Sequence, residues 1–340
     1  MIRLGGQVYQ NASNVISSSG IRSNGTTLLE SCDLGHFTKY LGLFLVFLFI
    51  TLGTVGNTVV AVILTCTRRI FPSSTTLFII NLTISDFLTC ATVMPFDIVY
   101  WLHFPVWTLQ PAVCKLWNAL FYTLHASSSM FIVAIGIDTY LTVSAPFHSQ
   151  TIRTSRKTFT VIVVIWVWSL MVGVLIFVFQ KKPPQGAYLF EINHIGYGIY
   201  LAIHMILPQI LASCCYFKLF RIARLHAISI KSMQVSVTSE NTPSKAQPSD
   251  KLNFREEITL AKTFLLITIA YFLCWNPFLA VQILFIFEVD RKVDWCTLET
   301  VDTVLCWFAY LQCCLNPVFY GIRKKYFRKL FEKVVRDLKD

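Results

Sequence analysis

Long apolar stretches, separated by shorter polar segments, make up most of this chain of 340 residues. Seven of them carry few charges and are long enough to cross a bilayer; they lie at 40–66, 75–101, 112–143, 158–179, 195–219, 258–287 and 298–321. A helix needs about 20 mainly apolar residues to span ~30 Å of hydrocarbon. Lipid offers no hydrogen-bond partner to an unpaired backbone group, and the stretches are too long for barrel strands. The pattern therefore predicts seven membrane-spanning helices.

The composition supports this prediction, because 55% of the residues are apolar, only 14% are charged, and the mean hydropathy is +0.59. A water-soluble domain with these values would expose far too much apolar surface. We therefore expect an all-α membrane protein, a seven-transmembrane helix bundle followed by a short amphipathic C-terminal helix.

The positions of the basic residues predict the orientation of the chain. Of the 29 Lys and Arg residues, 21 lie in the second, fourth and sixth polar segments, in the C-terminal tail, or, for Lys218 and Lys262, at the ends of the stretches that border the sixth segment. Membrane proteins keep their Lys- and Arg-rich loops in the cytosol. A multi-pass plasma-membrane protein with an extracellular N-terminus and a cytosolic C-terminus is therefore expected. This distribution accounts for the net charge of +11, so we expect membrane lipid and no nucleic acid as a partner.

Three parts follow from this organisation, namely an extracellular tail at 1–36, the helix bundle at 37–322, and an amphipathic helix with a cytoplasmic tail at 323–340. The first part carries glycosylation sequons at Asn11 and Asn24, on the side where glycosylation occurs. It has no apolar stretch typical of a cleaved signal peptide.

Two polar segments have a composition of their own. Residues 221–255 are rich in Ser, Thr, Pro, Gln and Lys, which predicts a long disordered cytoplasmic loop. In 323–340, apolar residues recur at helical spacing among basic ones, which is typical of a helix lying on the inner leaflet. The alternative for this second segment is a solvated charged tail.

Several apolar stretches contain polar or helix-breaking residues that contact with lipid does not explain. Asp86 lies near the middle of the second stretch, where a carboxylate needs polar partners inside the bundle. Candidate partners at similar depth are Asn57, Ser128 and Asn316. Helices are interrupted, and backbone carbonyl groups freed, at Pro208, Pro277 and Pro317.

In order and spacing, these residues resemble the pattern of rhodopsin-like (class A) G-protein-coupled receptors. The matching motifs lie between Gly53 and Phe331 and are Gly56-Asn57, Leu82-x-x-x-Asp86, Cys114, Trp166, Pro208 with Tyr216, Cys274-Trp275-Asn276-Pro277, and Asn316-Pro317-x-x-Tyr320. The segment Trp307 to Pro317 is also similar to amine and trace-amine receptors. The resemblance implies a receptor that binds an extracellular small molecule or peptide between its helices and passes a movement of the sixth helix to a heterotrimeric G protein.

The resemblance also implies roles for individual residues. The ligand pocket would be lined by Phe121, Tyr122, His125, Tyr200, His204, Trp275, Phe278, Gln282, Cys306 and Tyr310. Trp275 and Pro277 would form the toggle and the hinge of the sixth helix, with Tyr216, Pro317 and Tyr320 as further switch residues. Asp86, Ser128 and Asn316, with Asn57 nearby, would hold Na⁺ and waters; the alternative is a polar network without an ion. We expect no other metal or cofactor.

One departure from the family pattern concerns signalling. The family's Asp-Arg-Tyr motif reads Asp138-Thr139-Tyr140 here, and Glu257 is the acid that the missing Arg would meet at the inner end of the sixth helix. Thr139 removes a cation used in the resting ion pair and at the G-protein interface. The alternative function is therefore a receptor-like protein with weak or no G-protein signalling, which acts as a decoy or in trafficking.

A second departure concerns the outer cysteines, which are Cys32, Cys114 and Cys296. The family's partner for Cys114 would lie in the segment 180–195, which contains no Cys. Three is an odd number, so at least one of these residues lacks an intramolecular partner. We favour a disulfide between Cys32 and Cys296. A disulfide between Cys114 and either of these residues is the alternative.

A third departure concerns the ligand. Phe121 stands where amine receptors place the Asp that pairs with the ligand ammonium. Asp97 could substitute for that Asp, or could simply reach interfacial water. The last outer loop is acidic, which hints at a cationic peptide or amine. A transporter or channel would normally carry several charges within the membrane, and no catalytic constellation is visible, so we do not expect an enzyme.

Overall fold

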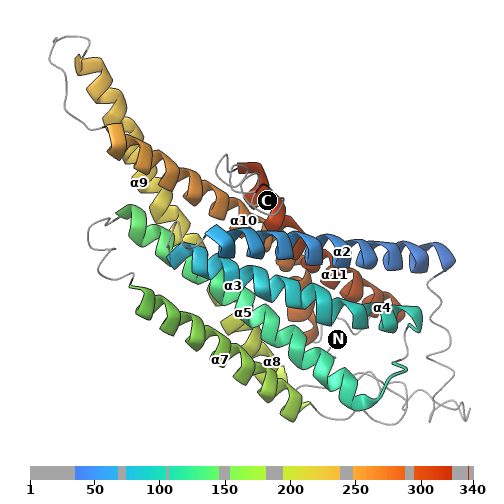
Figure 1. Cartoon of the computed structure of the whole chain (residues 1–340). Helices are drawn as coiled ribbons and strands as arrows, with labels where there is room; N and C mark the ends of the chain where they lie inside the picture. The colour runs from blue at the N-terminus through green and yellow to red at the C-terminus, as the bar shows by residue number, and fades with distance from the viewer. Residues whose placement is uncertain are drawn as a thin grey trace, which may run out of the picture.

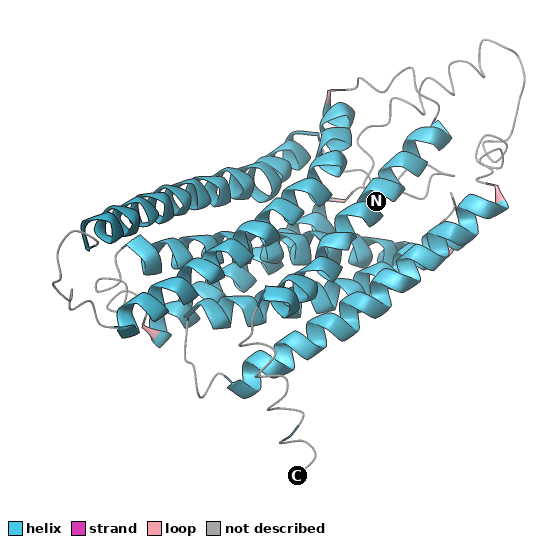
Figure 2. Ribbon diagram, turned by 90° about the horizontal axis from the view of Figure 1, so that it is seen from above, coloured by secondary structure: helices cyan, strands magenta, loops and turns pink. Residues whose placement is uncertain are grey.

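The computed structural model describes residues 35–67, 74–104, 107–144, 154–180, 194–237, 248–287, 295–323 and 336. In these ranges the regular secondary structure is helical, and no strand occurs (Figure 2). The helices in chain order are α2 (His36–Thr67), α3 (Ser74–Leu88), η1 (Thr89–Val93), α4 (Met94–Leu102), α5 (Pro111–Ser144), α7 (Ser155–Phe179), α8 (His194–Leu201), η2 (Ala202–Ile206), α9 (Leu207–Val237), α10 (Pro248–Ile286) and α11 (Trp295–Arg323).

These elements form seven rods that are long and apolar enough to span a membrane. The prediction of a seven-helix membrane bundle is thereby confirmed. The rods run along one another (Figure 1), with α5 in the middle, packed against α3, α7, α9 and α10. In its most apolar window, 78% of α5 is buried, against 28% for α2. α5 is therefore the element against which a site in the bundle is built.

The outward face of α7 shows where the bundle meets lipid. Phe159, Val164, Val167, Val174 and Val178 on this helix are each at least 60% exposed. In water this would be a large apolar patch, whereas in a bilayer these side chains contact hydrocarbon at no cost.

Two wide π-helical turns, η1 and η2, interrupt the second and fifth rods. Pro95 follows η1 and Pro208 follows η2. Proline has no backbone N–H and its ring clashes with the carbonyl four residues earlier, so the preceding turn widens. Each wide turn rotates the outer part of its rod relative to the inner part. Pro208 was singled out in the sequence, whereas Pro95 was not.

The helices extend further into 221–255 than the composition of this segment predicts. α9 continues to Val237, and α10 begins at Pro248. Apolar residues at helical spacing, with Lys, Arg and Ala between them, suit a continued helix, and proline is accepted in the first turn of a helix. The two helices pack against each other and project beyond the rest of the bundle (Figure 1).

Some of the predicted features lie outside the described residues. They are Asn11, Asn24, Cys32 and the segment 324–340 apart from residue 336. The side chains of Glu257 and Cys296 are also outside the description, although both residues belong to helices. Glycosylation, the disulfide and the amphipathic helix therefore stay predictions.

Candidate functional site

Inside the bundle lies the fully buried carboxylate of Asp86 on α3. Asn316 Nδ2 on α11 donates to Asp86 Oδ2 at 2.7 Å, and Ser128 Oγ on α5 donates to Asp86 Oδ1 at 3.2 Å. The Cys313 thiol lies 3.6 Å from Oδ1. The structure thus brings together Asp86, Ser128 and Asn316, which are far apart in the sequence.

Asn57 lies beside this cluster, although its described hydrogen bonds go to backbone. Its Nδ2 donates to Gly53 O at 2.9 Å and to Cys313 O at 3.0 Å, and so ties α2 to α11. Asn57 Oδ1 and Asn316 Oδ1 are buried oxygens without a hydrogen-bond partner. Hard cations such as Na⁺ bind oxygen ligands, so the Asp86 carboxylate beside the Ser128 hydroxyl fits such an ion, with the two buried amide oxygens as further candidate ligands.

A row of serines continues the network towards the centre of α5. Ser128 Oγ lies 2.9 Å from Ser85 Oγ, and Ser85 Oγ lies 2.6 Å from Ser127 Oγ. Ser85 and Ser127 were not among the predicted site residues. Their signal in the sequence was the run Ser127-Ser128-Ser129 inside an otherwise apolar helix.

Above this network, His125 joins three helices. Its Nδ1 lies 2.6 Å from the Tyr200 hydroxyl on α8, and its Nε2 lies 3.1 Å from the Tyr271 hydroxyl on α10. A neutral imidazole donates at one nitrogen and accepts at the other, so one tyrosine donates and the other accepts. The His125 and Trp275 rings are 4.1 Å apart between centroids.

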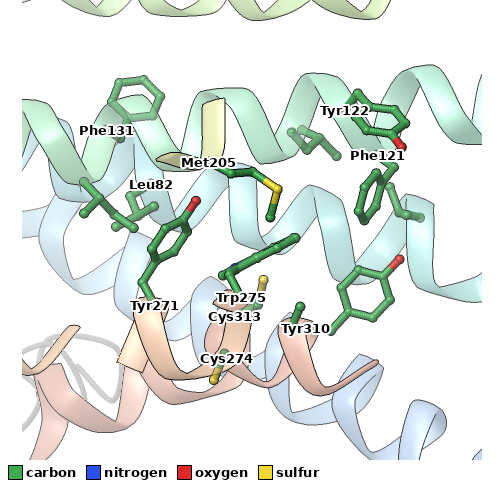
Figure 3. Packing of buried hydrophobic residues seen from close by; sticks show 14 of the residues in the cluster. Leu82, Phe121, Tyr122, Phe131, Met205, Tyr271, Cys274, Trp275, Tyr310 and Cys313 are labelled. Atoms are coloured by element: carbon green, nitrogen blue, oxygen red, sulfur yellow. The ribbon is translucent and has the colours of Figure 1, made fainter. Parts of the chain in front are cut away.

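Aromatic rings surround Trp275, which is 4% exposed. Figure 3 shows Trp275 between Tyr271 and Tyr310, with the side chain of Met205 reaching towards it. Phe121 lies 6.2 Å from the Trp275 ring and 6.1 Å from the Tyr310 ring, between centroids. Phe278 also packs on Trp275, at 6.1 Å. The predicted pocket residues Phe121, Trp275, Phe278 and Tyr310 therefore meet in one buried layer, and Pro277 follows Trp275 by two residues inside α10.

A second chain of hydrogen bonds crosses the outer part of the bundle. Tyr122 donates to the Tyr197 hydroxyl at 3.4 Å, Tyr197 donates to Gln282 Oε1 at 2.8 Å, and Gln282 Nε2 donates to Asp302 Oδ1 at 2.5 Å. The chain connects α5, α8, α10 and α11. Tyr197 and Asp302 were missing from the predicted pocket. The sequence did point to Tyr197, because it lies one helical turn before the predicted pocket residue Tyr200.

Asp97 on α4 belongs to the same outer layer. The Tyr310 hydroxyl on α11 donates to Asp97 Oδ2 at 3.1 Å. Asp97 is 1% exposed, so its side chain does not reach the surface, and the interpretation as an interfacial acid is wrong for this structure. Asp97 Oδ1 is buried without a hydrogen-bond partner.

Two further predicted pocket residues complete the layer. His204 in η2 stacks on Tyr200 with 5.1 Å between ring centroids, and its Nδ1 is a buried atom without a hydrogen-bond partner. Cys306 on α11 is fully buried. No group of three or more metal-ligating residues occurs within the described ranges.

At the opposite end of α5, the structure places the predicted switch residues. The Thr75 hydroxyl on α3 donates to Asp138 Oδ2. Thr139 is 4% exposed, and Lys218 Nζ on α9 lies 5.5 Å from the centre of the Tyr140 ring.

Two tyrosines and a proline complete the set of switch residues. Tyr216 and Tyr320 are buried, and the Tyr320 hydroxyl has no hydrogen-bond partner. Pro317 lies so near Gly56 that a Cβ on that glycine would be 3.0 Å from the proline ring. At this level α2 and α11 are in close contact, as the Gly-Asn motif requires.

Comparisons with known proteins agree with this architecture. The family model described as "7 transmembrane receptor (rhodopsin family)" matches residues 56–320. The alpha-1A adrenergic receptor of Homo sapiens is 28% identical over 312 positions, which cover 84% of this chain and 66% of that receptor. The Rattus norvegicus protein of the same name is 27% identical with the same coverage. The alpha-1D adrenergic receptor of Rattus norvegicus is 24% identical over 319 positions, covering 85% of this chain and 56% of the receptor.

The chain thus spans slightly less than two thirds of the length of these relatives. The matched region includes Asp86, Trp275 and Asn316, and it ends at Tyr320.

Proposed function

The chain belongs to the rhodopsin family of seven-transmembrane receptors, and we propose that it binds an extracellular ligand between its helices and transmits a movement of α10 to a heterotrimeric G protein. It acts at the plasma membrane with its N-terminus outside. The family is one of receptors and is not enzymatic in general.

The observation that carries this proposal is the position of His125. Its two ring nitrogens contact Tyr200 on α8 and Tyr271 on α10, and its ring packs on Trp275. Pro277 lies inside α10, two residues beyond Trp275. A ligand that displaces any of these side chains alters the contacts that hold α10 against α5. Packed interfaces of this kind have discrete arrangements, so a small displacement is converted into a helix movement.

The walls of this layer suggest the size of the ligand. They are aromatic, with a small number of polar groups from His125, Tyr200 and Gln282, which suits a small molecule or the end of a peptide. The relatives are named as adrenergic receptors, which supports a ligand of small-molecule size. At 28% identity or less, their ligand itself is not carried over to this chain.

A second candidate function rests on Thr139, which places no cation at the inner end of α5. A receptor-like protein that binds a ligand but signals weakly, as a decoy or in trafficking, would need no more than the outer layer of the site. The recruitment assay below separates the two functions.

The experiment measures recruitment of engineered Gα subunits of each main class to the full chain in cells. His125→Phe keeps the ring and removes both hydrogen bonds, so we expect basal recruitment to rise several-fold at equal surface expression. Ser129→Ala is the matched control, because the Ser129 hydroxyl bonds only Ala126 O on its own helix, at 2.9 Å. If His125→Phe recruits no Gα subunit, even combined with Thr139→Arg, the signalling proposal fails and the decoy function is favoured.

A further inference from the structure

A cation lies at the contact between α5 and α9, at the end of the bundle that the proposed orientation places in the cytosol. Lys218 on α9 is exposed, and its Nζ lies 5.5 Å from the centre of the Tyr140 ring on α5. A ring face attracts an ammonium group within about 6 Å. Tyr140 is half-buried and packs against the core of the bundle. Its ring therefore supports the ammonium group, while the charge stays accessible from the cytosol.

Two successive contacts along α5 and α9 define the side of α9 on which Lys218 lies. A Cβ on Gly136 would lie 3.7 Å from Cys215 Cβ, so the two helices are in contact at this level. Tyr140 lies about one turn after Gly136 on α5. Lys218 follows Cys215 by three residues on α9 and contacts Tyr140. Lys218 is therefore on the side of α9 that faces α5.

Two arginines on the same part of α9 lie on a different face of the helix. Arg221 and Arg224 are exposed and follow Phe217 by four and seven residues, so the three side chains share one face. Phe217 is 64% exposed, which identifies this face as the one in contact with lipid. Arg221 and Arg224 are therefore placed to reach lipid headgroups, whereas Lys218 is placed to meet a protein that docks against α5.

The neighbouring side chains of α5 add no positive charge to this surface. Thr139 is uncharged and 4% exposed, and Asp138 accepts a hydrogen bond from the Thr75 hydroxyl on α3. A docking protein thus meets the ammonium group of Lys218 beside the end of α5. The chemical group that an exposed ammonium group recognises best is a carboxylate, through a charge-assisted hydrogen bond.

We propose that Lys218 binds a carboxylate of the Gα subunit, and that Tyr140 is the positioning residue that holds the Lys218 ammonium group beside α5. This inference rests on the proposed receptor function and names a residue pair of its G-protein-binding surface. Docking excludes water from the pair, and both the cation–π contact and the charge-assisted hydrogen bond become stronger when water is excluded. An anionic lipid headgroup would offer the same negative charge, and the test separates the two partners.

The test measures binding of purified, nucleotide-free heterotrimeric G protein to the full chain in nanodiscs of phosphatidylcholine. The background is His125→Phe, for which a raised basal recruitment is expected. Lys218→Gln should raise the concentration of G protein at half-maximal binding at least ~30-fold, the loss typical of removing one partner from a charge pair that becomes buried. Lys218→Arg should retain binding, because a guanidinium group also binds carboxylates and aromatic faces.

The positioning role of Tyr140 is tested by a double-mutant cycle. Tyr140→Phe keeps the ring and should bind as the background does, whereas Tyr140→Leu should weaken binding several-fold. Combined with Lys218→Gln, Tyr140→Leu should have no further effect, because residues that act through one contact are not additive. Arg221→Gln is the matched control, since it removes one positive charge from the lipid-facing side of the same helix and should leave G-protein binding unchanged.

The titration is repeated in nanodiscs that also contain phosphatidylserine. A loss on Lys218→Gln that appears only with phosphatidylserine would assign Lys218 to a lipid headgroup and overturn the inference. An equal loss on Arg221→Gln, or a loss on Tyr140→Leu that is the same with and without Lys218, would overturn it as well. Binding that is insensitive to Lys218→Gln would overturn this inference and retain the receptor function. Failure of every variant to bind any Gα class would overturn both.

Discussion

The hydroxyl of Thr139 donates a 2.7 Å hydrogen bond to the carbonyl oxygen of Ile135, one turn earlier on α5. The side chain is thus bonded to its own helix and carries no charge at the position where the resemblance implies an arginine. An exposed ion pair is usually worth less than ~1 kcal/mol, whereas a buried charge-assisted contact at an interface is worth about 2 kcal/mol or more. Loss of the G-protein contact should therefore outweigh loss of the resting ion pair.

We predict weak G-protein activation by the wild type and a several-fold increase for Thr139→Arg. The measurement is nucleotide exchange on purified G protein at equal receptor density. Thr139→Val is the control, since it removes the hydroxyl without adding a charge and should not increase activation. The argument fails if the Arg variant is no more active than the wild type, or if the wild type already matches a reference receptor with Arg at this position.

A second prediction concerns the ion site at Asp86. We propose that Na⁺ neutralises this buried carboxylate, with Ser128 and Asn316 at hand. A tenfold excess of Na⁺ over its dissociation constant would stabilise the folded protein by about 1.4 kcal/mol. The wild type should therefore melt several degrees higher in NaCl than in choline chloride of equal ionic strength, and ligand affinity should depend on Na⁺. Asp86→Asn should remove both effects.

Ser129→Ala is the matched control for the ion site. Its hydroxyl donates to Ala126 O on the same helix, at 2.9 Å, and no hydrogen bond joins it to Asp86. The Na⁺ effect should survive this change. A wild type that melts at the same temperature in both salts would show that the cluster is a polar network without an ion.

The bundle was predictable because the membrane imposes one requirement on every rod. The fourth apolar stretch was expected at 158–179, and α7 spans Ser155–Phe179. The meeting of Asp86 with Asn316 was predictable as well, but only from the resemblance, since 230 positions separate the two residues. Hydropathy alone does not specify which faces of two helices meet.

The outer polar chain from Tyr122 to Asp302 was less accessible to sequence reasoning. Which residues take part in it depends on how far each rod is rotated about its axis, and the wide turns η1 and η2 change that rotation. Asp302 lies near the outer end of the apolar stretch expected at 298–321, and it was not singled out as a site residue. The structure buries it, since this first part of α11 packs inside the bundle.

The orientation of the chain provides a third prediction. The 21 basic residues in alternate segments predict an N-terminus outside and a C-terminus in the cytosol. An epitope tag at the N-terminus should be stained on intact cells, and one at the C-terminus only after permeabilisation. Staining in the opposite pattern would contradict the orientation on which the proposed ligand and G-protein sides both depend.

The last prediction concerns the close approach of α5 and α7 at Gly173. A Cβ on Gly173 would lie 1.9 Å from Thr123 Oγ1 and 3.0 Å from Ala119 O. Forcing extra atoms into a packed core usually costs about 1–3 kcal/mol. Gly173→Ala should therefore lower the free energy of unfolding by about that amount, which is measured as a lower melting temperature. Gly136 on α5 is the matched control, because its Cβ would meet Cys215 Cβ at an ordinary 3.7 Å. Gly136→Ala should be neutral or stabilising by up to ~1 kcal/mol, through helix propensity.

A double mutant makes the Gly173 prediction specific to its neighbour. Thr123→Ala removes the Oγ1 atom that the new methyl group would strike, at the expense of a 2.8 Å hydrogen bond to Ala119 O on the same helix. The pair Gly173→Ala and Thr123→Ala should therefore melt higher than Gly173→Ala alone, and recovery should be partial because the Ala119 carbonyl remains 3.0 Å away. Residues in contact show interaction free energies of about 0.5–3 kcal/mol in such cycles, whereas distant ones are additive. Additive effects, or equal effects of Ala at Gly173 and Gly136, would mean that α5 and α7 do not approach each other this closely.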